Sequence, residues 1–285
     1  MEDKMIKLGY FADGPWSHRA LKTLLSDSTI NISFICVRYD SRDPVLLKIA
    51  AEHGIPALCH SNVNSEEFLR EVATFECTMF VSMSFNQIFR RNLYSLPPLK
   101  TINCHAGKLP FYRGRNVLNW VLINDESEFG ITVHYIDDGV DTGDIILQKT
   151  FPITELDTYG SLLERAYGGC SDLLYEAVKQ IQQGTARVTR QETVSPWGFY
   201  CVGRGPGDEL LDWKQTSREV FNFVRALSDP GPRARTLLGD AEIQINAVRY
   251  FGDAPVYRGI PGSVVGKDGD TFFVKTLDSF VQVLE

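Results

Sequence analysis

The sequence predicts an α/β fold, with a mostly parallel sheet that carries helices on both faces and a smaller β-rich unit after it. Two observations predict this. Short apolar runs alternate with helix-like segments early in the chain, as in parallel strands joined by crossover helices. Short β-like runs separated by Gly and Pro fill the end of the chain. The length of 285 residues also favours two packed units over one core.

The first elements are read from apolar runs and capping residues. Asp43 before Pro44 is a paired helix-start signal, and Gly54 ends that helix near His53. In chain order, strands are predicted at Ile6–Phe11, Ile32–Val37, Thr78–Ser82 and Lys100–Cys104, and the other helices at Trp16–Leu25 and from Asn64 or Ser65 to about Thr74. In such sheets, ligands collect at the carboxyl ends of the strands.

The alternation changes after Asp125. Two strand-like runs, Gly130–Ile136 and Asp144–Phe151, flank the loop DDGVDTG. A long amphipathic helix is expected from about residue 157 to 183, closed by Gly184, with a break or kink where Gly168 and Gly169 adjoin. The segment 187–208, rich in Gly, Pro, Ser and Thr, resembles a crossing between units. We therefore place an N-terminal domain at 1–187 and a C-terminal subdomain at 188–285.

The C-terminal subdomain has one clear helix, Ser217–Leu227, capped by Thr216 or Ser217. Its strands are predicted at Glu242–Val248, Gly262–Val265, Thr271–Val274 and Phe280–Leu284, which suggests a small barrel or an open sheet.

Composition and missing motifs exclude several functional classes. A net charge of −7 disfavours nucleic-acid binding, which requires concentrated positive charge. No secretory leader or membrane-spanning run is present, and the six scattered cysteines fit a reducing compartment, so we expect a cytoplasmic protein with no membrane partner. GxGxxG, Walker A and GxSxG motifs are missing. The five histidines lack metal-ligand spacing, so no metal is expected.

Asn103, His105 and Asp141 are the candidate catalytic residues. Asn103 and His105 lie two apart at a strand end, so their side chains share a face, and Asp141 lies in a loop that can return over the same edge. An amide that donates to an oxyanion, an imidazole that donates or moves a proton, and an orienting carboxylate would suit acyl transfer to an amine. Spacing alone leaves simpler roles open: a cap for Asn103, a hydrogen-bonded core residue for His105 and an Asx turn for Asp141.

Two segments carry a resemblance to a known family. The segment NCHAGKLPFYRGRNVLNWVL, followed by GITVHYIDDGVDTGDIILQ, resembles the signature of the folate-dependent formyltransferases: Asn-x-His, Leu-Pro-x-x-x-Gly, then Asp-Thr-Gly. The family includes methionyl-tRNA, glycinamide ribonucleotide and sugar N-formyltransferases. The resemblance implies a Rossmann-like N-terminal domain and an OB-like C-terminal subdomain.

The resemblance also implies a reaction and a cofactor site. The family transfers the formyl group of N10-formyltetrahydrofolate directly to an amine, through a tetrahedral intermediate and without metal. Asn103 and His105 would stabilise the oxyanion, and Asp141 would support His105, which we expect to act as the base. The pterin pocket would be formed by two loops, for which we predict Met83, Phe85, Gln87, Ile88, Tyr135, Ile136, Asp137 and Gly139. A strand-to-helix turn packed into the core would also explain the apolar residues of the first loop.

The acceptor is predicted to be a nucleotide-linked amino sugar. From Val188 to Glu285 there are 11 Lys and Arg against 13 Asp and Glu, a balance of −2 that is unsuited to tRNA. Local segments such as GRGPGDELLDW are most similar to sugar N-formyltransferases, in particular the formyltransferase domain of the lipid A aminoarabinose-modifying enzyme, which points by analogy to surface-polysaccharide biosynthesis. The predicted substrate-binding residues are Tyr112, Arg113, Gly114, Arg115, Asn116, Phe199 and Arg204. Solvated loop charges would also explain Arg113 and Arg115, and an aromatic cluster that fixes the linker would also explain Phe199.

Several alternative functions also fit the sequence. Methionyl-tRNA formylation would require salt-dependent tRNA binding, and formyltetrahydrofolate hydrolysis would release formate without an amine. A folate-binding module without catalysis would not need Asn103, His105 and Asp141 together. The helix at 157–183 or the last strands could support a homodimer.

Overall fold

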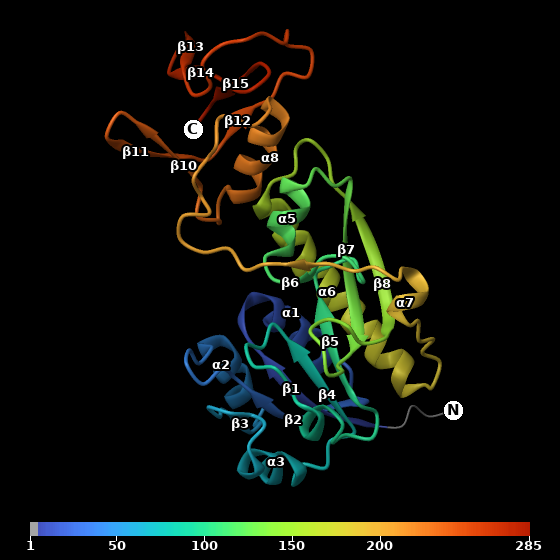
Figure 1. Cartoon of the computed structure of the whole chain (residues 1–285). Coiled ribbons are helices and arrows are strands. Elements are labelled where there is room, and N and C mark those ends of the chain that lie inside the picture. Colours follow the sequence, from blue (N-terminus) through green and yellow to red (C-terminus); the bar gives the residue numbers. More distant parts are fainter. Residues whose placement is uncertain (1–4) are drawn as a thin grey trace. The chain divides into compact units, whose positions relative to one another are not determined.

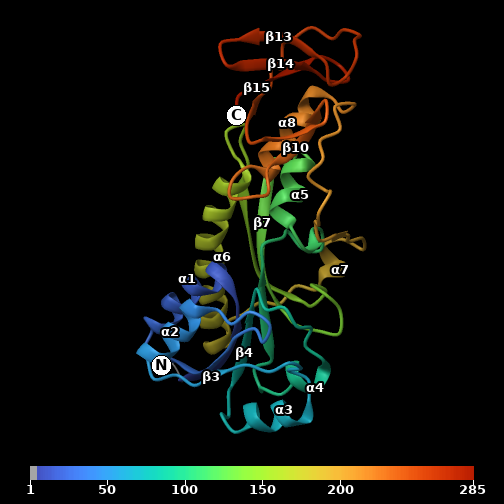
Figure 2. The same cartoon turned by 90° about the vertical axis from the view of Figure 1, so that its left-hand side faces the viewer.

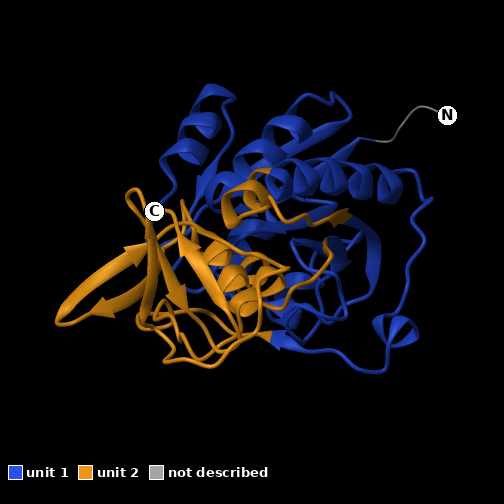
Figure 3. Ribbon diagram, turned by 90° about the horizontal axis from the view of Figure 1, so that it is seen from above, with its two compact units in different colours: residues 1–114, 130–150, 165–200 blue, residues 115–129, 151–164, 201–285 orange. Residues whose placement is uncertain are grey.

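The computed structural model describes residues 5–285. The chain forms two compact units whose segments alternate along the sequence (Figure 3). The first unit contains residues 1–114, 130–150 and 165–200, and the second contains residues 115–129, 151–164 and 201–285. Two stretches from the middle of the chain thus belong to the second unit. The contiguous boundary expected after residue 187 stays a prediction.

A seven-stranded, mostly parallel sheet forms the centre of the fold, as predicted (Figure 1). The strand β1 pairs in parallel with β2 and β4, β2 with β3, and β4 with β5, whereas β7 runs antiparallel to β5. In sheet order the strands are β3 (Ala57–Leu58), β2 (Ile30–Cys36), β1 (Ile6–Ala12), β4 (Met79–Met83), β5 (Thr101–His105), β7 (Glu128–Tyr135) and β8 (Ile145–Pro152).

Helices cover both faces of this sheet (Figure 2). On one face lie α1 (Gly14–Leu25) and α6 (Tyr159–Gln182), joined by a Thr23–Ser171 hydrogen bond, together with α2 (Pro44–Glu52). On the other lie α3 (Glu66–Ala73) and α4 (Arg91–Tyr94), which pack with Phe11 and Phe80 into an aromatic-rich core. Alternation along β1 explains the split, because Tyr10 points to α1 and bonds the Ser17 carbonyl while Phe11 points to the aromatic core.

Capping residues define the helix ends as expected. Asp43 accepts from the Val45 and Leu46 amides, and Ser65 accepts from the Phe68 amide. The long helix α6 continues through Gly168 and Gly169, so of the break or kink that was expected there, the break is not seen. Packing of this helix against α1 outweighs the low helix propensity of two glycines.

The second unit is built around α8 (Ser217–Leu227), which starts in a full capping box made by Thr216 and Glu219. An open antiparallel sheet follows, in the order β12 (Val248–Arg249), β15 (Phe280–Val283), β14 (Thr271–Lys275) and β13 (Val264–Asp268). A separate hairpin consists of β10 (Ala234–Leu238) and β11 (Ala241–Ile245). Of the two predicted forms, the open sheet is the one observed.

Several elements, α4 and β10 among them, were not expected from the sequence. Helix α5 (Val117–Ile123) packs against α8, where Asn119 Nδ2 donates to the Ala226 carbonyl. The crossing segment is partly ordered, with α7 (Gln191–Val194) and with β9 (Tyr200–Cys201) paired to β6 (Arg113–Gly114). Within residues 5–285, no helix is both long and apolar enough to span a membrane.

Candidate active site

Asn103 and His105 lie at the carboxyl end of β5, on the same face of the sheet. Cys104, between them, points to the opposite face and contacts the Cys170 carbonyl of α6 at 3.7 Å. The antiparallel register places His134 of β7 directly beside Asn103, with Asn103 Nδ2 at 3.2 Å from His134 Nε2. The pleat of β5 therefore presents an amide and an imidazole together at the strand end.

The loop between β7 and β8 brings Asp141 back over these residues. Its Oδ2 lies 3.6 Å from His105 Nδ1, and its Oδ1 lies 3.5 Å from His134 Nε2. The same carboxylate accepts a 2.8 Å hydrogen bond from the Gly114 amide. The structure thus brings together the three residues that the sequence placed in one cluster.

The environment of Asp141 favours its ionised form. Burial acts to raise the pKa of this carboxyl, whose side chain is 11% exposed. Interactions with His105 and His134 and the hydrogen bond from the Gly114 amide outweigh burial and hold the pKa of this carboxyl well below the ordinary aspartate value. Asp141 is therefore a fixed negative charge beside two imidazoles.

The backbone fixes the orientation of the His105 ring. Its Nε2 lies 2.7 Å from the Tyr112 carbonyl oxygen, and since a carbonyl only accepts, this nitrogen carries the proton and donates. That leaves Nδ1 facing Asp141. Gly107 allows the arrangement, because a Cβ there would collide with His105 Nε2 and the Tyr112 carbonyl.

His134 is the site residue that the sequence did not reveal. Its side chain is 3% exposed, and its Nδ1 donates to the Tyr135 carbonyl at 2.8 Å. The strand that carries it was predicted, but its pairing with β5 was not. Only the register shows that His134 lies opposite Asn103.

The two loops predicted to hold the cofactor pack against one core. Phe85 from the first loop and Ile136 from the second both contact the aromatic cluster that contains Phe11 and Phe89. Asp138 of the second loop accepts a 2.8 Å hydrogen bond from the Tyr94 hydroxyl of α4. The loops are therefore anchored to the same face of the sheet.

The other residues of the first loop have different surroundings. The Met83 side chain is buried in the core, while Ile88 is 68% exposed. The Gln87 amide accepts from the Val63 N–H and donates to the His60 carbonyl. Only Ile88 of these three presents an uncommitted apolar side chain at the surface.

In the second loop, polar groups organise the turn. Asp137 accepts from the Gly139 amide and from the Thr142 hydroxyl. The Tyr135 ring lies 5.0 Å from the Lys100 ammonium. The loop thus keeps a defined shape in the absence of regular secondary structure.

The predicted substrate-binding residues of the first unit adjoin the catalytic cluster. Tyr112 bonds His105 through its carbonyl, and its ring meets Phe199 edge-on at 4.8 Å. The Gly114 amide binds Asp141. The Arg113 guanidinium donates to Gln191 Oε1, and it lies 5.6 Å from the Tyr200 ring. Arg113 is therefore already occupied by protein groups.

The remaining substrate candidates belong to the second unit. Arg115 is exposed, and only its backbone amide is bonded, to the Cys201 carbonyl. Asn116, at φ 53°, accepts through its side chain from the Arg204 amide. The Arg204 guanidinium lies over two aromatic rings, Trp120 at 5.4 Å and Phe223 at 5.5 Å.

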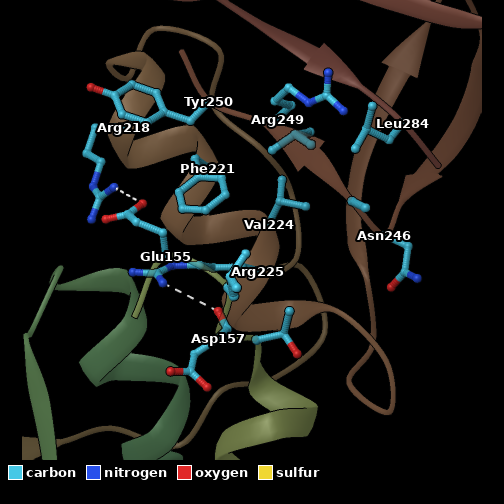
Figure 4. Close-up of a pocket in the computed structure, with 14 residues that line it drawn as sticks. Glu155, Asp157, Arg218, Phe221, Val224, Arg225, Asn246, Arg249, Tyr250 and Leu284 are labelled. Carbon is cyan, nitrogen blue, oxygen red and sulfur yellow. Dashed lines mark hydrogen bonds and ion pairs between the residues drawn. The ribbon is translucent and has the colours of Figure 1, made fainter. Parts of the chain in front are cut away.

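A separate cavity of about 580 Å³ lies within the second unit (Figure 4). Its walls come from α8, from residues 155–158 and from residues 246–250 and 284. Arg218 pairs with Glu155 there, and Arg225 bonds the Asp157 carbonyl. The cavity contains none of the predicted site residues. No cluster of three or more His, Cys, Asp or Glu suited to a metal ion occurs among residues 5–285.

Comparison with known proteins decides the family. The family model Formyl transferase matches residues 15–178, and the model Formyl transferase, C-terminal domain, matches residues 205–285. The methionyl-tRNA formyltransferase of Pelobacter propionicus is 31% identical over 85% of this chain and 74% of its own length. That of Geobacter metallireducens is 33% identical over 79% and 71%. The chain belongs to the formyl transferase family. It is a formyltransferase that uses formyltetrahydrofolate as its donor.

Solved structures share the fold of this formyltransferase. A sugar 3N-formyl transferase, WlaRD, determined in the presence of dTDP and 5-N-formyl-THF, superposes with a TM-score of 0.68 at 21% identity, over 98% of this chain and 97% of that one. The N-formyltransferase of Helicobacter canadensis, in complex with folinic acid and dTDP-3-aminofucose, gives 0.67 at 20% identity, over 99% of both chains.

Proposed function

We propose that this formyltransferase transfers the formyl group of N10-formyltetrahydrofolate to a primary amine of a nucleotide-linked amino sugar. The observation that carries the proposal is the convergence of Asn103, His105 and Asp141 at one strand end, around a buried carboxylate. Among the described residues, no serine or cysteine side chain bonds Asn103, His105 or Asp141, which supports direct attack of the amine on the formyl carbon.

Each of the three residues has a distinct role in the proposal. One N–H of the Asn103 amide is directed to His134, and the second is available to stabilise the formyl oxygen as negative charge builds on it. His105 takes the amine proton at Nδ1, because its Nε2 already donates to Tyr112. Asp141 stabilises the imidazolium that results.

The residues present fit a reduced folate donor. Its pterin ring needs apolar walls, and the two loops offer apolar side chains, with Phe85 and Ile136 packed against a shared core and Ile88 exposed. The donor supplies the activated formyl group. We assign the pterin to these loops, next to the β5 end.

The acceptor is argued from charge and from uncommitted side chains. Arg113 is bound to Gln191, so Arg115 is the arginine of this segment that we assign to the diphosphate. Exposed Trp197, Phe199 and Tyr200 offer rings for the sugar or the base. The balance of −2 after residue 187 disfavours tRNA, and two neighbours of the same fold were crystallised with dTDP or a dTDP-sugar.

Methionyl-tRNA formylation is the second candidate, favoured by sequence. The curated relatives at about 30% identity carry that name. The two candidates differ in salt dependence, since tRNA affinity would fall steeply between 50 and 200 mM salt, whereas a single diphosphate responds weakly.

The test is a mass-spectrometric assay with N10-formyltetrahydrofolate and UDP-, dTDP-, GDP- and CMP-linked amino sugars, with charged initiator tRNA in parallel. We expect one sugar to gain a single formyl group and Asn103→Ala to abolish the gain. Formylated tRNA with unmodified sugars would replace the proposed acceptor with the second candidate. Formate release without any acceptor would indicate a hydrolase.

A further inference from the structure

Gln191 occupies the centre of a buried hydrogen-bond network at the active-site loop. It begins α7 in the crossing segment and is 5% exposed. Its Nε2 donates to the carbonyl of Asp141 at 2.9 Å and to the carbonyl of Gly143 at 2.8 Å. Its Oε1 accepts from Arg113 Nη2 at 2.6 Å and Nε at 3.2 Å. Both ends of this side-chain amide are therefore used.

The loop that Gln191 contacts has a conformation that requires support. Asp141 lies at φ 54°, in the left-handed region that non-glycine residues rarely adopt. Gly143 is packed so closely that a Cβ would meet the Tyr135 carbonyl. The carbonyl groups of Asp141 and Gly143, on either side of Thr142, both accept from the side-chain amide of Gln191. Without that amide, two buried carbonyls would lose their partner.

The carbonyl oxygen of the Gln191 side chain binds the segment that also holds the Asp141 carboxylate. Arg113, which it binds, immediately precedes Gly114, and the Gly114 amide donates to the Asp141 carboxylate. One glutamine thus connects the backbone of Asp141 to the segment that bonds its side chain. These contacts all lie within the first unit.

We propose that Gln191 is a positioning residue, which holds the Asp141 carboxylate against His105 for formyl transfer. The inference rests on the proposed function of Asp141. The residue lies between the two family matches, which end at residue 178 and begin again at residue 205. The sequence indicated only a crossing segment there, and the contacts give that segment a part in the active site.

The experiment measures kcat, both KM values and the thermal midpoint for five variants. Gln191→Leu removes every hydrogen bond, and Gln191→Glu keeps the acceptor for Arg113 but loses both donors to the loop. Gln282→Leu is the matched control, because Gln282 is also 5% exposed and donates to Thr271 Oγ1 in the C-terminal sheet. The last two variants are Asp141→Asn and its combination with Gln191→Leu.

We expect kcat of both Gln191 single variants to fall at least about tenfold with each KM within about threefold, while Gln282→Leu keeps kcat. The double variant should be no slower than Asp141→Asn alone, because residues that act through one another are not additive. Gln191 variants with normal kcat, or an additive loss in the double variant, would refute the inference while leaving the role of Asp141 intact. An Asp141→Asn enzyme with normal kcat would instead refute the proposed function of the site, and the inference with it.

Discussion

Asp141→Asn isolates the charge that the structure places beside His105. The substitution preserves shape, and the amide oxygen can still accept from the Gly114 amide. What disappears is a negative charge 3.6 Å from His105 Nδ1 and 3.5 Å from His134 Nε2. If His105 takes the amine proton, its positive charge then develops without a counterion.

The separation sets the size of the effect. At 3.6 Å, with an effective dielectric constant of about 20, a unit charge pair is worth about 4 to 5 kcal/mol. Since about 1.4 kcal/mol corresponds to a tenfold rate change, kcat should fall on the order of 10³-fold. KM for both substrates should change little, because the interaction strengthens only in the transition state.

The assay is steady-state formyl transfer at saturating donor, with product quantified by mass spectrometry and with folding checked by circular dichroism. Asp229→Asn in the second unit is the control, because its carboxylate bonds the Arg233 guanidinium and not an imidazole. A folded Asp141→Asn enzyme with kcat within tenfold of the wild type would refute the assignment of an electrostatic role to Asp141.

Four further predictions follow from other contacts. Arg115→Gln should raise KM for the nucleotide sugar about tenfold, as expected for loss of one charged hydrogen bond, and leave KM for the folate unchanged. If the variant and the wild type had the same KM for the nucleotide sugar, Arg115 would not belong to the site. Gly107→Ala should lower kcat, because the added methyl group displaces His105 or the Tyr112 carbonyl. The affinity for folate, measured by fluorescence titration, should stay unchanged. Thr216→Ala should lower the free energy of unfolding by about 1 kcal/mol in urea titration with activity intact, since it removes the cap of α8. Because the pKa of Asp141 is lowered in the folded protein, its ionised form stabilises the fold above about pH 4, and this stabilisation is lost as pH falls toward the folded-state pKa. Between pH 5 and 3 the thermal midpoint of Asp141→Asn should therefore fall less steeply than that of the wild type.

Local sequence determined most of the central sheet and its helix caps. Asp43 with Pro44 and Ser65 before Glu66 satisfy helix amides within their own first turns, so neighbouring residues suffice to predict them. The apolar periodicity gave the strands, and the spacing of Asn103 and His105 gave their shared face. The motif around Asp141 gave the family, which the comparisons confirmed.

Other features depend on contacts between distant segments. Helix α5 escaped prediction because its Asn116 N-cap is in the left-handed region and makes no side-chain cap bond, while packing against α8 stabilises it. His134 joined the site through strand register, and Gln191 joined it from a segment with little regular structure. The sequence by itself therefore determined the chemical groups and the strand end that presents them. Tertiary structure decided their partners and the charge state of Asp141, because hydrogen bonds and ion pairs act through space between residues as far apart in the chain as Asp141 and Gln191, which are 50 positions apart.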